Sequence, residues 1–165
     1  MKFIILGSGS SMGVPRPDGN FGNCNPNNPK NLRSRCSAII VTKKTNILID
    51  TSPDLRYQMI KNKIRNINSV LYTHHHADQT HGINDLRVFF LKNKKSIPLY
   101  APSTTRKYLY NSFKYCFKNL KDYPAILDLK IMKKKIKFGK YINIESIKIR
   151  HGSIECLSFI INKKI

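Results

Sequence analysis

The stretch Thr73-His74-His75-His76-Ala77-Asp78-Gln79-Thr80-His81-Gly82 decides how this sequence is interpreted. Four of the five histidines of the chain fall in it, beside an aspartate, which a purely structural role does not explain. The preceding segment Ser69–Tyr72 predicts a short strand, and loops at strand ends are where sheet proteins place their sites. In such a turn His74 and His76 converge on one ion from alternate positions, since imidazole nitrogens bind zinc at about 2.0–2.1 Å. The stretch predicts a metal site, in which Asp78 either contacts a second ion or holds a water.

The segments around this stretch predict a layered α/β arrangement with a mixed sheet. Apolar runs and alternating patterns predict strands at Lys2–Leu6, Ser37–Thr42, Asn46–Asp50, Ser69–Tyr72, Ile97–Tyr100, Tyr141–Arg150 and Cys156–Ile161. Helices are expected from Ser52-Pro53 onward, over Asn84–Leu91 and over Ser103–Phe117. Residues 14–35 are rich in Pro, Gly and Asn and predict a long loop, a feature that is usually functional. Residues 123–135 fit neither a helix nor a strand clearly.

Composition limits the class of protein. A length of 165 residues fits one domain, and no apolar run approaches the roughly 20 residues that cross a bilayer. The apolar segment Met1–Leu6 is too short for a signal-peptide core and there is no C-x-x-C pair, so we expect the four cysteines to be reduced thiols in the cytoplasm. The net charge of +21 permits nucleic-acid binding, but the lysines are spread along the whole chain. Compositional drift is the preferred explanation of that charge.

The histidine stretch resembles a known signature. His74-x-His76-x-Asp78 followed by Gly82 is similar to the H-x-H-x-D-H-x-x-G motif of the metallo-β-lactamase superfamily. Ile47–Asp50 resembles the early strand and aspartate of the same superfamily, and His151-Gly152 stands where its fold supplies a third histidine. Three segments resemble the branch that contains phosphoribosyl 1,2-cyclic phosphate phosphodiesterase, namely Gly7–Pro15, Asp50–Arg56 and Asp85–Arg87. The resemblance extends over the whole chain.

The resemblance implies a fold and a set of ligands. The fold is a metallo-β-lactamase-like αββα sandwich, of which residues 1–165 would form a single domain, incomplete at the C-terminus and part of a longer family domain. His74, His76 and His151 would hold one ion, and Asp78 would contact another. Gln79 stands where the signature has a histidine, so either His81 replaces it or the second site is weak or absent. The cofactor would be Zn²⁺ or Mn²⁺, as one or two ions, and Asp50 would support the metal loop.

The same resemblance implies a metal-dependent hydrolase. The preferred activity is a phosphodiesterase that uses a metal-bound hydroxide, oriented by Asp78, on a small phosphate ester or cyclic phosphate. Two alternatives remain open: an RNA-processing nuclease of the same superfamily, and a truncated, inactive metal-binding domain. We expect no membrane partner, little turnover from residues 1–165 alone, and a homodimer or aggregation through an exposed sheet edge.

Overall fold

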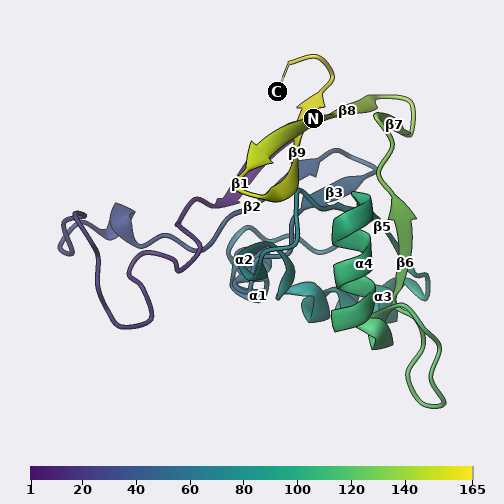
Figure 1. The fold of residues 1–165 in the computed structure, drawn as a ribbon, viewed down its shortest axis with the longest axis horizontal. Helices are drawn as coiled ribbons and strands as arrows, with labels where there is room; N and C mark the ends of the chain where they lie inside the picture. The colour runs from purple at the N-terminus through teal and green to yellow at the C-terminus, as the bar shows by residue number, and fades with distance from the viewer. Residues whose placement is uncertain (165) are drawn as a thin grey trace.

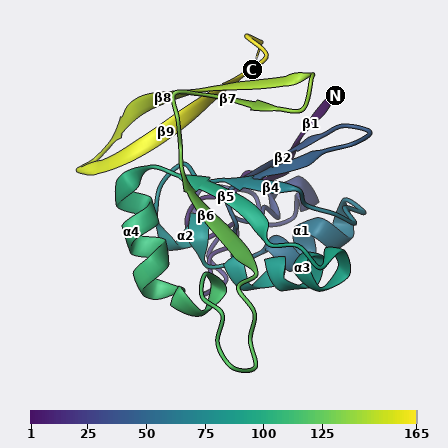
Figure 2. The same cartoon turned by 90° about the vertical axis from the view of Figure 1, so that its right-hand side faces the viewer.

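Two β-sheets and a helical layer make up the computed structural model, which describes residues 1–164. A six-stranded sheet has the order β1-β2-β3-β4-β5-β6, and a three-stranded sheet, β7-β8-β9, lies against one of its faces (Figures 1 and 2). The helices cover the other face (Figure 2). The strands are β1 (Lys2–Gly7), β2 (Ser37–Val41), β3 (Asn46–Ile49), β4 (Ser69–Leu71), β5 (Ile97–Ala101), β6 (Leu127–Ile131), β7 (Lys135–Phe138), β8 (Ile142–His151) and β9 (Ile154–Ile161). The helices are α1 (Leu55–Lys61), α2 (Ala77–Thr80), α3 (Arg87–Asn93) and α4 (Ser103–Ser112), with short 3₁₀ turns at Pro29–Asn31, Ile83–Leu86 and Lys114–Cys116.

Strand alternation divides the apolar residues between two cores. On β2 and β3, Ile39 and Leu48 face the helices, whereas Ile40 and Ile47 face the smaller sheet. All four side chains are fully buried, which is why these strands are apolar on both faces. The second core is completed from the smaller sheet by Ile142, Ile144 and Ile161. The layered α/β class predicted from the sequence is confirmed.

The strand directions bring several loop starts to one edge of the larger sheet. Strands β1, β2 and β3 pair antiparallel, and β3 to β6 run parallel to one another. In parallel pairing Leu71 lies beside Tyr100, and Tyr100 lies beside Lys130. The segments that follow β4, β5 and β6 therefore all leave from the same edge, where open α/β sheets commonly bind ligands.

The predicted elements are present with shifted boundaries. Helix α1 begins at Leu55 rather than at Pro53, because Ser52 Oγ accepts the Asp54 N–H in a turn before the helix (3.1 Å). The predicted helix over Ser103–Phe117 ends at Ser112 and continues as a 3₁₀ turn. The ambiguous residues 123–135 contain strand β6, and β7 begins at their end.

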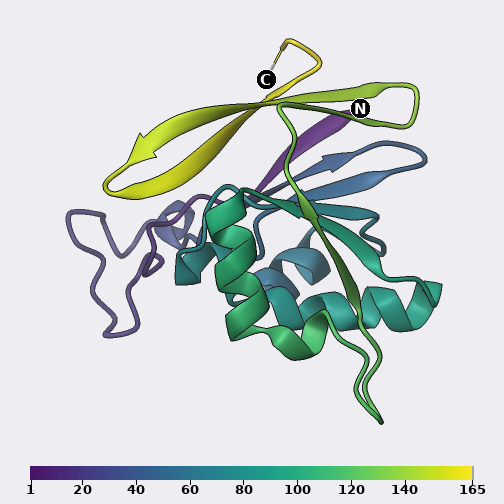
Figure 3. The same ribbon diagram turned by 45° about the vertical axis from the view of Figure 1, so that its right-hand side comes forward.

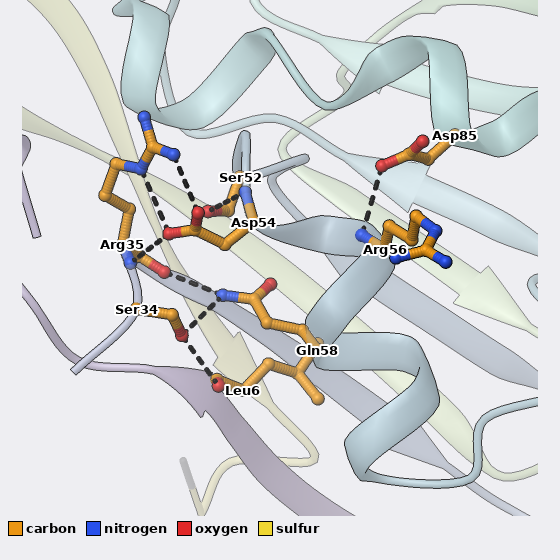
Figure 4. Close-up of polar contacts among 8 residues, drawn as sticks. All are labelled: Leu6, Ser34, Arg35, Ser52, Asp54, Arg56, Gln58 and Asp85. Atoms are coloured by element: carbon orange, nitrogen blue, oxygen red, sulfur yellow. Dashed lines mark hydrogen bonds and ion pairs between the residues drawn. The ribbon is translucent and has the colours of Figure 1, made fainter. Parts of the chain in front are cut away.

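The expected long loop joins β1 to β2 and extends away from the sheets (Figure 1). Its return end is attached to α1 by Arg35, whose guanidinium donates to both carboxylate oxygens of Asp54, at 2.7 and 3.0 Å (Figure 4). Gln58 is buried beside this pair and donates to Ser34 Oγ at 3.0 Å and to the Arg35 carbonyl at 2.8 Å. The Asp54 carboxyl has a lowered pKa because it accepts these hydrogen bonds from Arg35. The base of the loop is thus a fixed part of the fold.

Strands β8 and β9 form a long hairpin that crosses the top of the molecule toward α4 (Figure 3). Its tip is the turn at Gly152, and His151 is the last residue of β8. Within residues 1–164, the helices are all too short or too polar to span a membrane.

Candidate metal centre

Three histidines from two distant segments meet at the edge of the larger sheet. His74 and His76 follow β4, and His151 ends β8. His76 Nδ1 lies 3.1 Å from His74 Nε2 and 3.2 Å from His151 Nε2. One ring nitrogen from each residue lies within 4.8 Å of the other two. His74 is buried, His76 is half-buried and His151 is exposed, so the group opens toward solvent on the hairpin side.

Two of the three nitrogen–nitrogen separations fit one tetrahedral cation. Zinc binds imidazole at about 2.0–2.1 Å, which places two nitrogens of a tetrahedral site about 3.3 Å apart. The two short separations, 3.1 and 3.2 Å, are close to that value. Three neutral imidazoles are also a donor set that zinc and similar ions prefer. The residues present therefore fit a divalent cation.

A hydrogen-bond relay orients the His74 ring. Asp50 Oδ1 accepts the Thr73 N–H, and Asp50 Oδ2 accepts the Thr73 hydroxyl, both at 2.8 Å. When Asp50 is ionised, the single hydroxyl proton is committed to it, so Thr73 Oγ1 accepts a proton from His74 Nδ1 at 2.9 Å. His74 consequently carries its proton on Nδ1, and Nε2 presents a lone pair to the other histidines.

Burial sets the charge state of this relay. It raises the pKa of the Asp50 carboxyl more than the hydrogen bonds from Thr73 lower it, and the resulting pKa is about 7. Burial, reinforced by the neighbouring His76 and His151, lowers the pKa of the His74 imidazole to about 4. His74 is therefore neutral near pH 7, as a metal ligand must be.

The β8–β9 hairpin contacts the loop that carries His74 and His76 directly. The Leu157 N–H of β9 donates to the Thr73 carbonyl at 3.0 Å, and Cys156 Sγ lies 3.6 Å from His74 Nδ1. Glu155 accepts a hydrogen bond from Thr104 of α4 at 3.2 Å and pairs with Lys148 at 2.8 Å. These contacts hold the strand that carries His151 over the loop that carries the other two histidines.

The remaining histidines of the stretch point elsewhere. The ring of His75 lies 5.1 Å from that of Tyr108 on α4. His81 Nδ1 lies 3.1 Å from Thr80 Oγ1, and its ring packs edge-on against Phe113 at 5.6 Å. The structure thus places His81 outside the three-histidine group, and its role as a ligand stays a prediction.

Asp78 and Gln79 lie in the short helix α2, next to the group but outside it. The negative charge of Asp78 contributes to raising the pKa of Asp50 and opposes the lowering of the His74 pKa, which places it near both. Gln79 is buried, and within residues 1–164 its Oε1 has no hydrogen-bond partner. These residues do not form a second three-ligand group of His, Cys, Asp or Glu in the described part of the chain.

Sequence reasoning missed Thr73 and Cys156. Thr73 precedes the histidines directly, and its hydroxyl type beside a metal ligand is the signal that could have identified it. Nothing in the sequence indicates that Cys156 lies against His74, because that contact joins residues 82 positions apart.

Comparison with known proteins supports the architecture. Residues 45–165 match the model of a family described as the beta-lactamase superfamily domain. The chain is similar to a diphosphatase from the PhnP family, with 29% identity and a TM-score of 0.84 over 96% of this chain and 61% of that one. Human tRNase Z, short form, has a TM-score of 0.65 at 15% identity, over 98% of this chain and 64% of that one, which supports the fold alone.

A curated protein also matches. It is called octanoyltransferase, comes from Porphyromonas gingivalis, and is 31% identical over 163 residues. The match covers 96% of this chain and 32% of that protein. The chain thus spans about a third of this relative and less than two thirds of the diphosphatase.

Proposed function

The chain belongs to the beta-lactamase superfamily domain family, and on that premise we propose that it is a metal-dependent hydrolase of phosphodiesters. The observation that carries the proposal is the convergence of His74, His76 and His151 within 4.8 Å. The similarity to a diphosphatase over 96% of the chain favours a substrate with a phosphorus–oxygen bond. A small phosphate ester or cyclic phosphate is the proposed substrate.

The ligands would be His74, His76 and His151, through one ring nitrogen each. A divalent cation held there supplies Lewis acidity and lowers the pKa of a water toward 7. Asp50 and Thr73 keep the proton of His74 on Nδ1, so that Nε2 is free to coordinate. Asp78, in the first turn of α2, is the proposed carboxylate that accepts a proton from the attacking water. The net charge of +21 favours the approach of an anionic substrate.

The proposal assigns one ion to this chain. Asp78 and His81 remain predicted ligands of a second ion. A pair of ions can contact both the attacking and the leaving oxygen of a phosphodiester, whereas one ion cannot do so equally well. We therefore expect residues 1–165 alone to hydrolyse bis-(p-nitrophenyl) phosphate slowly, and rapid turnover would contradict the one-ion assignment.

Metal content tests the site. The chain is loaded with zinc or manganese, desalted, and analysed by elemental mass spectrometry. We expect about one ion per chain, and loss of most of it in the His74→Ala, His76→Ala double variant. His75→Ala is the matched control, because His75 lies in the same loop with its ring against Tyr108. Full metal content in the double variant would show that the site is elsewhere.

Turnover tests the activity separately. Hydrolysis of bis-(p-nitrophenyl) phosphate is compared with a metal-only blank for the wild type and for the same variants. We expect the activity above the blank to disappear with a chelator and in the double variant, and to persist in His75→Ala. Hydrolysis that survives both treatments would contradict a metal-dependent mechanism at these histidines.

A further inference from the structure

A lysine-rich segment connects the two sheets. Residues 130–137, here called the lysine strap, contain Lys130, Lys133, Lys134, Lys135 and Lys137. The strap runs from the end of β6, at the edge of the larger sheet, into β7 of the smaller sheet (Figures 2 and 3). Three of its five lysines, Lys130, Lys133 and Lys135, line one hollow, whereas Lys134 faces another.

The backbone of the strap is held in place. The Met132 N–H donates to the Ala101 carbonyl at 2.9 Å. Ser146 of β8 donates its N–H to the Lys134 carbonyl at 2.9 Å and its hydroxyl to the Lys133 carbonyl at 3.2 Å. The backbone from which the lysines project is therefore fixed, which reduces the backbone entropy lost when they bind a ligand.

The strap borders a hollow of about 570 Å³. Its lining consists of three lysines, one tyrosine and two isoleucines: Tyr100, Lys130, Ile131, Lys133, Lys135 and Ile136. The Tyr100 ring is fixed edge-on against Phe138 at 5.5 Å. The volume is in the range of ligand sites, and the lining combines ammonium groups with an aromatic ring.

Acidic groups neutralise only part of the strap. Lys130 pairs with Asp128 at 3.1 Å, and Glu145 lies opposite Lys135 in the β7–β8 register. Among residues 1–164, the other four lysines of the strap form no ion pair. A net positive surface remains beside the hollow.

We propose that the lysine strap and its hollow bind single-stranded nucleic acid. The lysines would contact successive phosphates, and one base would lie against the Tyr100 ring, which is the usual combination in proteins that bind single strands. A second copy of the chain is an unfavourable occupant, because it carries the same charge of +21. A duplex is also unfavourable, because its bases are stacked inside and do not reach a tyrosine ring.

The strap lies near the histidine group but is separate from it. Leu71 of β4 pairs with Tyr100 of β5, and Tyr100 pairs with Lys130 of β6. Lys130 therefore lies two strand spacings from Leu71, which is about 10 Å across the sheet. The inference does not depend on the proposed hydrolysis, because it concerns binding without metal or turnover.

Fluorescence anisotropy with a labelled oligo(U) of about 12 nucleotides, in the presence of a chelator, tests the inference. The variant Lys130→Gln, Lys133→Gln, Lys135→Gln is compared with Lys92→Gln, Lys94→Gln, Lys95→Gln, which removes the same charge at the end of α3. We expect the Kd to rise about 10-fold or more in the strap variant and less than about 3-fold in the control. The slope of log K against log salt should fall by about 2 in the strap variant.

The aromatic contact is tested at constant charge. Tyr100→Leu should weaken binding about 5-fold or more with an unchanged salt slope, whereas Tyr100→Phe should bind like the wild type. Oligo(dT) and an RNA duplex are tested in the same way. Binding of oligo(U) or of oligo(dT) supports the inference, whereas a duplex bound as tightly as the single strands contradicts it. Equal weakening by the two lysine variants, or no binding by a wild type shown to be folded by its melting curve, would overturn it.

Discussion

Thr73 Oγ1 donates to Asp50 Oδ2 across 2.8 Å, although the two residues are 23 positions apart in the chain. Asp50 follows β3 and Thr73 lies just beyond β4, the parallel neighbour of β3. The bond therefore joins two strand ends and, through the same hydroxyl, reaches His74 Nδ1 at 2.9 Å. A residue that does not itself bind metal thus controls the ring nitrogen that would.

Replacing Thr73 by valine should weaken metal binding. The variant keeps the shape of the side chain but removes the acceptor for the His74 proton, so the ring is free to adopt the other tautomer. We expect zinc affinity to fall about 10-fold to 100-fold in a competition titration with a chromophoric chelator. Thr73→Ser retains the hydroxyl and should bind close to the wild type. Wild-type affinity in the valine variant would mean that the relay has no influence on the ligand.

Asp50 should make the stability of the metal-free chain depend on pH. Its pKa is raised from 3.8 to about 7 in the folded state, so between these values the folded chain holds a proton that the unfolded chain has released. The free energy of unfolding therefore falls as pH rises through this range. The free energy of unfolding of an Asp50→Asn variant, minus that of the wild type, should rise from about pH 4 to 7. Above about pH 7 this difference should stay constant.

Urea unfolding in the presence of a chelator measures this difference, which should be on the order of a few kcal/mol. Asp122→Asn is a suitable comparison, because Asp122 is exposed in the loop before β6. Its stability curve should run parallel to that of the wild type. If the Asp50→Asn curve were also parallel, Asp50 would not titrate in this range.

Gly82 should tolerate no side chain. A Cβ at this position would overlap the Ser52 carbonyl, which is backbone and not free to move. Gly82 also donates its N–H to the Thr51 carbonyl at 2.9 Å, so the histidine loop packs closely on the turn before α1. We expect Gly82→Ala to cost about 3 kcal/mol or more, or to prevent folding.

Gly22→Ala provides the comparison for Gly82. A Cβ there meets nothing within 4 Å, and only its φ of +60° disfavours a side chain. The expected cost is about 1 kcal/mol. Similar melting temperatures for the two alanine variants would show that the contact with Ser52 relaxes easily.

The Arg35–Asp54 pair should hold the long loop against α1. Arg35→Gln removes the bidentate ion pair with Asp54. We expect the free energy of unfolding to fall by only about 1 kcal/mol, because the pair is partly exposed to solvent. Chymotrypsin cleavage after Phe21 should become faster, since the loop would open more often. Arg16→Gln breaks an exposed pair in the same loop and should leave the cleavage rate unchanged. Equal rates in both variants would mean that the pair does not attach the loop.

Much of this molecule could be predicted from local patterns. The apolar runs identified the strands, and the spacing of His74 and His76 indicated that they would meet. Element boundaries were less predictable, because Ser52 is used in a turn and not as the cap of α1. Contacts between distant segments left no local signal, so neither the Thr73 relay nor the hollow beside Tyr100 was foreseen. The sequence does not distinguish Lys133 and Lys135 from the other lysines, since only the sheet arrangement places them beside the Tyr100 ring.

The order in which the site can assemble follows from the position of His151 at the hairpin tip. His76 and His151 are separated by 75 residues, so their meeting is a late, non-local event. During synthesis the first two histidines emerge long before the third and offer an incoming ion only two nitrogens. A complete set of ligands exists only once β9 has closed on Thr73. Binding of a cation by all three histidines would therefore require that the hairpin has docked. The rate of cation binding during refolding would then measure the rate of hairpin docking.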